Sequence, residues 1–540
     1  MKRSRLLFLF GSGVFLSLVS VSSANSEYQE WLRKTQETYQ EYKDKRDKEF
    51  TGFLQKQWKE MYVQQGFVSD KTPKPVKIPK VKKQAKKIQE TKKKPVIVKV
   101  PKFKPQPVQK PIEIATITPI VKPLPVKPVI SKPAEKITQK PTIPDTKQKQ
   151  VVSTPERIPV PRPVQKPKKI QLPKGKPVSI SYFGLNIQFS YDPKMEQRIY
   201  GRVTKDTISK FWSTLSQSDY ELLQKQFDSK RAPLDLNDWS YAILVNKVAE
   251  KIYPGQSDAQ SMFTWYFMTK AGYSARIAYN DGGVYLLLPS KQKVFRAPYF
   301  TYDGVKYYSL KFDGQKSPAL KNLYTYDGHY PGAKSRMDMQ IKKPLVTGRQ
   351  DVKKTLKFKY RGKSYQVRTS YDKSMVDYLD TYPLLDLDLY LSTSVSEATA
   401  NPLLSQLGKI INGKSEEEAV NILLSFTQAA FKYKNDTEHF GGENYLFPEE
   451  TLHYAYSDCE DRVFMFAWLV RQLVGLEVVG LKYPGHLSAA VRFNEKVAGS
   501  SIKFHGKRYF IADPTYTNAR AGQSLPDYKK VSPTVVSVSG

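Results

Sequence analysis

A single segment rich in proline and lysine limits how this 540-residue chain can fold. Residues 71–177 contain 22 of the 37 prolines, 29 lysines and arginines, and only 5 aspartates and glutamates. Proline removes the backbone donor that helices and sheets need, and repulsion between like charges keeps a chain extended. The segment has one aromatic residue, Phe103, and too few apolar side chains to build a core. We therefore predict a disordered linker here, between an N-terminal part and a larger C-terminal part.

The linker also carries most of the positive charge. The net charge of the chain is +36, and residues 71–177 contribute 29 − 5 = +24 of it. A strongly basic chain is typical of nucleic-acid-binding proteins, but the linker lacks the aromatic side chains that stack on bases. We expect no nucleic-acid partner. We expect a spacer that also adheres to an anionic polymer of the cell envelope, such as peptidoglycan.

The N-terminus has the pattern of an export signal. Basic residues in 1–5 precede an apolar run from Leu6 to Val21 and the small residues 22–24. The run is shorter than the roughly 20 residues of a membrane-spanning helix. We predict a signal peptide over 1–24 and a bacterial protein that is periplasmic or secreted.

The residues after the signal show helical periodicity. Apolar and aromatic side chains from Tyr28 to Met61 recur at spacings of mostly 3, 4 or 7 on a charged background. The pattern predicts one amphipathic helix over 26–65, within an arm of residues 25–70. We expect this helix to dock on its own chain or to self-associate; recognition of a partner or a membrane surface is the alternative.

An internal repeat organises the C-terminal part. Both copies open with a predicted β-hairpin ending in Ser-Tyr-Asp, and each continues with a helix, a second apolar helix and two strand pairs. The matching segments are 178–195 with 356–375, 242–254 with 421–434, 257–259 with 457–459, 275–288 with 478–491, and 302–311 with 504–513. The repeat predicts two domains of similar fold, over 178–345 and 346–540.

The second copy contains a Cys-His-Asp series. Cys459, the only cysteine, follows Asp458 at the predicted start of an apolar helix, where the helix dipole favours a thiolate. His486 opens a predicted strand, and Asp513 ends the next one. A nucleophile, a base and an orienting acid on three such elements are what Cys-His-Asp chemistry requires. Cys459 is otherwise a buried apolar residue or an intermolecular link, and Asp513 before Pro514 is otherwise a turn residue.

The blocks DCEDR (458–462), YPGHLSAAV (483–491) and YFIADPTY (509–516) resemble the transglutaminase-like core of the papain superfamily, as found in secreted bacterial proteins. This resemblance implies an α+β fold of tandem domains, each with a central helix packed on an antiparallel sheet. It also implies that Cys459 is the nucleophile, His486 the general base and acid, and Asp513 the residue that orients His486. In the first copy Ala259, Gly283 and Lys311 occupy these positions, so we expect that copy to be inactive.

The resulting hypothesis is an exported cysteine-dependent acyl-transfer enzyme, a protease, amidase or transamidase. It would hydrolyse or transamidate amides of a peptide or protein substrate through a thioester, without a cofactor. The alternative is a non-catalytic envelope-binding or scaffold protein that keeps the fold as a relic. We expect no metal site, because His329, His439 and His505 lack metal-ligand spacing. The loop GGEN (441–444) is a candidate for lining a cleft.

Overall fold

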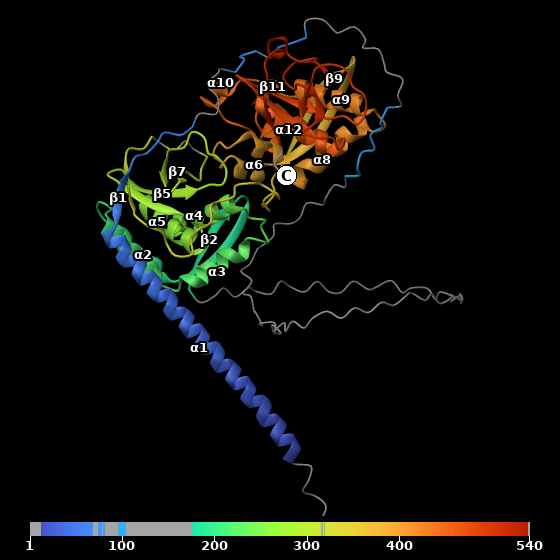
Figure 1. Cartoon of the computed structure of the whole chain (residues 1–540). Coiled ribbons are helices and arrows are strands. Elements are labelled where there is room, and N and C mark those ends of the chain that lie inside the picture. Colours follow the sequence, from blue (N-terminus) through green and yellow to red (C-terminus); the bar gives the residue numbers. More distant parts are fainter. Residues whose placement is uncertain are drawn as a thin grey trace, which may run out of the picture.

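The chain folds into a mixed α+β structure of helices and antiparallel sheets, as the sequence predicts at this coarse level (Figure 1). The computed structural model describes residues 12–67, 74–77, 79–81, 95–103, 175–314, 317 and 319–537. The predicted signal peptide over 1–24 has no described side chains, and its residues 1–11 lie outside the described part of the chain. The predicted domain boundaries stay predictions. No helix in the described part of the chain is both long enough and apolar enough to cross a membrane.

Helices and strands succeed one another along an N-terminal arm and two halves. The arm and first half contain α1 (Ser12–Lys56), β1 (Trp58–Met61), β2 (Lys176–Tyr182), β3 (Leu185–Tyr191), α2 (Lys205–Ser216), α3 (Tyr220–Lys230), α4 (Asp238–Ile252), α5 (Ser257–Lys270), β4 (Arg276–Asn280), β5 (Gly283–Pro289), β6 (Tyr299–Tyr302), β7 (Val305–Ser309) and β8 (Leu323–Tyr326). The second half contains β9 (Asp351–Tyr360), β10 (Lys363–Asp372), α6 (Lys373–Leu379), α7 (Leu387–Ser392), α8 (Glu397–Ile411), α9 (Glu416–Ala430), β11 (Lys432–Tyr433), α10 (Asp436–Phe440), α11 (Pro448–His453), β12 (Tyr456–Ser457), α12 (Cys459–Leu473), β13 (Val478–Tyr483), β14 (His486–Val491), β15 (Ser501–Phe504), β16 (Lys507–Ala512) and β17 (Thr534–Val536).

Each half has one larger antiparallel sheet. In the first half six strands lie in the order β1-β8-β4-β5-β7-β6, and in the second half five lie in the order β15-β16-β14-β13-β17. A separate hairpin precedes the central strands of each sheet in the chain, β2–β3 in the first half and β9–β10 in the second. The same elements therefore recur in the same order: a hairpin, a helix pair that includes α5 or α12, and the central strands of the sheet.

Each of these two hairpins has a two-residue turn that ends in glycine. Phe183-Gly184 joins β2 to β3, and Arg361-Gly362 joins β9 to β10, all four with φ between 44° and 81°. A two-residue turn with positive φ at both positions matches the twist of the strands, and glycine adopts it without strain. The β-hairpins predicted within 178–195 and 356–375 are confirmed.

The central helix of the second half is α12. Its residues from Val463 to Val470 are all buried, and it packs against α9 and β14. In the first half α5 packs in the same way against α4 and β5. A helix that is apolar on every face must be enclosed on every side. The first residue of α12, Cys459, is accordingly buried, whereas Ser257 at the start of α5 is exposed.

The predicted arm helix is correct only in its first part. It ends at Lys56, and Trp58–Met61 forms strand β1, which pairs with β8 at the edge of the first sheet. The apolar pattern of this short stretch does not separate a helix from a strand, and the open backbone of β8 decides in favour of the strand. Upstream, Phe50 and Leu54 of α1 are buried beside α2, so the helix docks on its own chain.

The linker is not disordered throughout. Residues 74–77, 79–81 and 95–103 lie along the second half, where blue segments border the orange and red elements (Figure 1). Val98 is buried and exchanges backbone hydrogen bonds with Gly413 and Lys414 near the start of α9. The prediction of a wholly disordered linker over 71–177 is wrong for these segments, because a few apolar side chains and free backbone groups suffice to dock them. Residues 104–174 lie outside the described part of the chain.

Candidate functional site

The predicted nucleophile lies at the first residue of α12. Cys459 is 1% exposed, and its thiol donates a hydrogen bond to Glu460 Oε2 at a distance of 3.0 Å. Burial raises the pKa of Cys459 well above the ordinary thiol value, and the neighbouring carboxylates of Glu460 and Asp458 raise it further. The thiol is therefore held in its protonated, unreactive form.

The other two predicted residues do meet. His486 at the start of β14 and Asp513 just after β16 are both buried, with 2.8 Å between His486 Nε2 and Asp513 Oδ2. Asp513 Oδ1 also accepts hydrogen bonds from the backbone N–H and hydroxyl of Thr515. Although burial alone would raise it, His486 and Thr515 lower the pKa of Asp513. For His486 the two effects are reversed: burial alone would lower its pKa, but Asp513 raises the pKa above its ordinary value.

The predicted acyl-transfer function is wrong. In the described part of the chain Cys459 is alone and buried, and no catalytic pair with His486 is formed. His486 binds Asp513 through Nε2, and its ring stacks on Tyr528 with 5.2 Å between centroids. The thiol instead faces acidic groups, which oppose the thiolate that acyl transfer requires.

The space beside Cys459 is occupied by a lysine from the linker. The Lys74 side chain is 7% exposed, and its Nζ forms ion pairs with four carboxylates. The N···O distances are 3.0 Å to Asp436, 3.0 Å to Glu443, 2.6 Å to Asp458 and 2.8 Å to Glu460. These acids come from the start of α10, the loop after it and the start of α12, so three parts of the second half converge on one ammonium group. We call this cluster of four carboxylates the lysine site.

Burial and charge act against each other in the lysine site. Burial alone would lower the pKa of Lys74, but Glu460, Asp458 and Asp436 raise it well above the ordinary value. For Glu460, burial raises the pKa and Lys74 lowers it, with a net lowering. The central pair is therefore an ammonium and an ionised carboxylate.

The other acids of the lysine site have raised pKa values. Burial raises the pKa of Glu443 to about 7 and raises the pKa of Asp458 well above its ordinary value, because one ammonium does not neutralise all of these groups. Asp461 at the same helix end accepts hydrogen bonds from the backbone N–H groups of Leu446 and Asp458. The lysine site thus holds an excess of acidic groups over cationic ones, which keeps the ammonium charged.

Backbone contacts hold the linker around Lys74. The hydroxyl of Tyr433 donates to the carbonyl oxygen of Pro75 at 2.7 Å. Farther along, Val81 N–H donates to Thr517 O at 3.1 Å, and Thr517 N–H donates to Pro79 O at 3.0 Å. The second half therefore contacts residues 74–77 and 79–81 of the linker through one side chain and several main-chain groups.

Two sets of groups in this region have ligand atoms close enough to hold a metal ion. Asp458, Cys459 and Glu460 form one set, and Asp436, Asp458 and Asp461 form the other, with atoms within 4.8 Å of one another. Neither set was predicted, because the spacing of histidine and cysteine in the sequence does not reveal clusters of carboxylates. In the structure the ammonium of Lys74 binds three of these carboxylates, so the cation of the site is supplied by the chain itself.

Several residues of the lysine site were not predicted from the sequence. The loop 441–444 was a candidate for lining a cleft, and its Glu443 does contact Lys74. Asp458 and Glu460 flank Cys459 directly, which was a visible signal against an activated thiol. Lys74 gave no signal, because it is one of 29 basic residues in a repetitive segment.

Comparisons of the chain with protein-family models, with curated proteins and with solved structures find no match. The geometry of the site is therefore the observation that bears on function.

Proposed function

We propose that this chain is a non-catalytic binding protein whose second half binds a lysine side chain carried on an extended, proline-flanked segment. One observation carries the proposal: the buried ammonium of Lys74 among four carboxylates. An ammonium group leaves water only where charged acceptors replace its hydration. The lysine site offers those acceptors at 2.6–3.0 Å and is therefore complementary to lysine.

The linker suits such a site. Lysine presents a compact charge with three donors, whereas the guanidinium of arginine is a planar fork that fits four converging carboxylates poorly. Proline beside the lysine favours the extended conformation before binding, so less entropy is lost on docking. The triplet Lys-Pro-Val at 74–76 recurs at 94–96, 127–129 and 176–178. The chain therefore carries several copies of the motif that the site binds.

The wider assignments are also proposals. The blocks around Cys459, His486 and Asp513, and the common element order of the two halves, support a pair of diverged transglutaminase-like units. The pattern of residues 1–24 supports export, and the charge of the linker supports adhesion to peptidoglycan or a similar polymer. Residues 28–42 of α1 expose Trp31, Tyr39 and Tyr42, which supports self-association through this helix.

The test uses full-length protein and a fluorescent peptide of residues 72–77, Thr-Pro-Lys-Pro-Val-Lys. In Lys74→Ala the lysine site is vacant, so we expect the peptide to bind and raise the fluorescence anisotropy. The wild type should bind at least ~10-fold more weakly, since its tethered Lys74 competes at an effective concentration in the millimolar range. Circular dichroism verifies that the variant is folded.

Two matched controls complete the test. Lys77 is exposed in the same segment, so Lys77→Ala should behave as the wild type does. A peptide with acetyl-lysine at the position of Lys74 should not bind, because it carries no charge. Equal binding of both peptides to Lys74→Ala, or binding of neither, would refute the proposal.

A further inference from the structure

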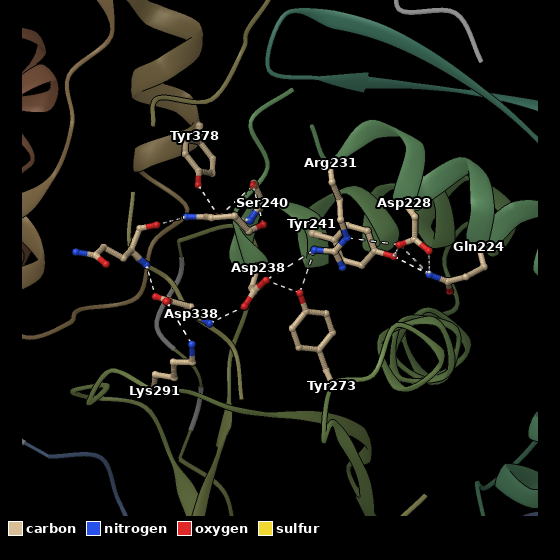
Figure 2. A network of polar contacts seen from close by, with 12 residues as sticks. Gln224, Asp228, Arg231, Asp238, Ser240, Tyr241, Tyr273, Lys291, Asp338 and Tyr378 are labelled. Carbon is tan, nitrogen blue, oxygen red and sulfur yellow. Dashed lines mark hydrogen bonds and ion pairs between the residues drawn. The ribbon is translucent and has the colours of Figure 1, made fainter. Parts of the chain in front are cut away.

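The first half contains a polar cavity that lies apart from the lysine site. Its volume is about 410 Å³, and its charged and aromatic lining consists of Asp228, Arg231, Asp238, Tyr273, Lys291 and Arg336. These residues come from the end of α3, the start of α4 and the segments after α5, β5 and β8. Figure 2 shows most of them around one hydrogen-bonded network.

Arg231 is held rigidly at the centre of this network. Its guanidinium lies 3.4 Å from the centroid of the Tyr241 ring, and its Nη1 donates to Tyr273 Oη at 3.1 Å. Ion pairs of 3.5 Å to Asp228 and 3.7 Å to Asp238 complete its surroundings (Figure 2). An arginine that is fixed before binding loses little entropy when it takes up a ligand.

The two aspartates of the cavity are already engaged by neutral donors. Asp228 accepts a hydrogen bond from Tyr241 Oη at 2.8 Å. Asp238 accepts from the hydroxyl of Tyr273 and, at 2.7 Å, from the backbone N–H of Asp338. Their role is to orient Arg231 and its tyrosines, so they do not form an open cation site.

Two more cations border the same cavity. Lys291 is 58% exposed, and its Nζ lies 3.4 Å from Asp338 Oδ2. Arg336 is exposed, and within the described residues it forms no ion pair. The lining thus carries three positive and two negative side chains, a net charge of 3 − 2 = +1. The hydrogen-bond donors that remain for a ligand therefore belong to these positive side chains.

We propose that this cavity binds a small organic anion through a carboxylate or phosphate group. Arg231 provides a preorganised guanidinium: its Nε and Nη1 already contact Asp228, Asp238 and Tyr273, and Nη2 is the donor left for the oxyanion within the described residues. Arg336 and Lys291 contact the same carboxylate or phosphate group from the rim of the cavity. The positions of these three residues in the sequence, 231, 291 and 336, are far apart, and only the fold of the first half unites them.

Isothermal titration of the full-length protein tests the proposal with two probes, inorganic phosphate and succinate. We expect at least one probe to bind with a Kd on the order of 1 mM or tighter, and the comparison of the two identifies the preferred oxyanion. The uncharged diamide of succinate should not bind. Because losing one charged hydrogen bond weakens binding about 10-fold, Arg336→Ala and Lys291→Ala should each raise the Kd by that factor.

A matched variant separates the cavity from general surface charge. Lys334 is exposed and lies two residues before Arg336 but does not line the cavity, so Lys334→Ala should leave the Kd unchanged. The proposal is overturned if neither probe binds below 10 mM, on the order of ten times the expected Kd, or if Lys334→Ala weakens binding as much as Arg336→Ala.

Discussion

The two halves of the molecule use equivalent helix ends in different ways. In the first half Asp258 at the start of α5 accepts a hydrogen bond from Val284 N–H at 2.9 Å, beside Gly283 at the start of β5. This hydrogen bond thus joins the start of α5 directly to the start of β5. In the second half Asp458 before α12 binds Lys74 at 2.6 Å, and His486 at the start of β14 binds Asp513. The helix end and the strand end have separate partners there.

The difference shows that nearby charges, rather than the helix dipole, decide the chemistry of a helix N-terminus. The dipole offers the equivalent of about half a positive charge. The carboxylates of Glu460 and Asp458 lie directly beside Cys459. Glu460 Oε2 accepts a hydrogen bond from the thiol, with 3.0 Å between Oε2 and Sγ. In a buried site these charges are weakly screened. A cysteine at the start of a helix is therefore not activated when acids flank it.

The largest expected effect concerns the reactivity of this thiol. Cys459 is the only cysteine, so all alkylation of the protein reports on it. At pH 8 we expect iodoacetamide to modify native protein at least ~100-fold more slowly than protein unfolded in guanidinium, because the native thiol is buried and protonated. Mass spectrometry over time measures both rates. If the alkylation rate of native protein rose with pH and had its midpoint below pH 8.5, Cys459 would be an activated thiol. The conclusion that nearby acids outweigh the helix dipole in the second half would then be wrong.

The next effect concerns the stability of the second half. Lys74→Ala leaves four acidic groups around an empty position, which we expect to destabilise this half by about 3–5 kcal/mol at pH 8. Hydrogen exchange of peptides from α12 measures the loss, and peptides from α5 should not change. The exposed Lys77→Ala should shift stability by less than about 0.5 kcal/mol. Equal protection of α12 in both variants would show that Lys74 does not hold the second half together.

The smallest effect is an opposite response of the two halves to pH. Burial raises the pKa of Glu449 in α11 to about 7, so the folded second half binds its proton more tightly than the unfolded chain does, and it loses stability as pH rises from about 4.5 to 7. Burial lowers the pKa of Lys270 in α5 to about 8, so the first half gains stability as pH rises from about 8 to 10.5. Urea titrations with pulse labelling of α11 and α5 measure each half separately.

Two variants check the assignment of this pH response. Glu449→Gln should reduce the loss in the second half by on the order of 2–3 kcal/mol, whereas the exposed Glu397→Gln should not. Lys270→Met should abolish the alkaline gain in the first half. If both halves kept their pH slopes in these variants, other groups would be responsible.

Much of the fold was predictable because it depends on local patterns. The hairpins at Phe183-Gly184 and Arg361-Gly362 follow from alternation around a turn, and the apolar run after Cys459 indicated a buried helix. The strand at Trp58–Met61 was not predictable, since its pairing partner β8 lies more than 250 residues away. The same limit applies to the lysine site.

The sequence by itself determined that this chain has two similar halves, a basic linker and one cysteine between two acids. Only the tertiary structure decided what those residues do. It placed Lys74 among four carboxylates, paired the Cys459 thiol with Glu460 and paired His486 with Asp513. The physical reason is that pKa values and ion pairs depend on burial and on distances between residues far apart in the chain, and neither quantity is encoded in a local pattern.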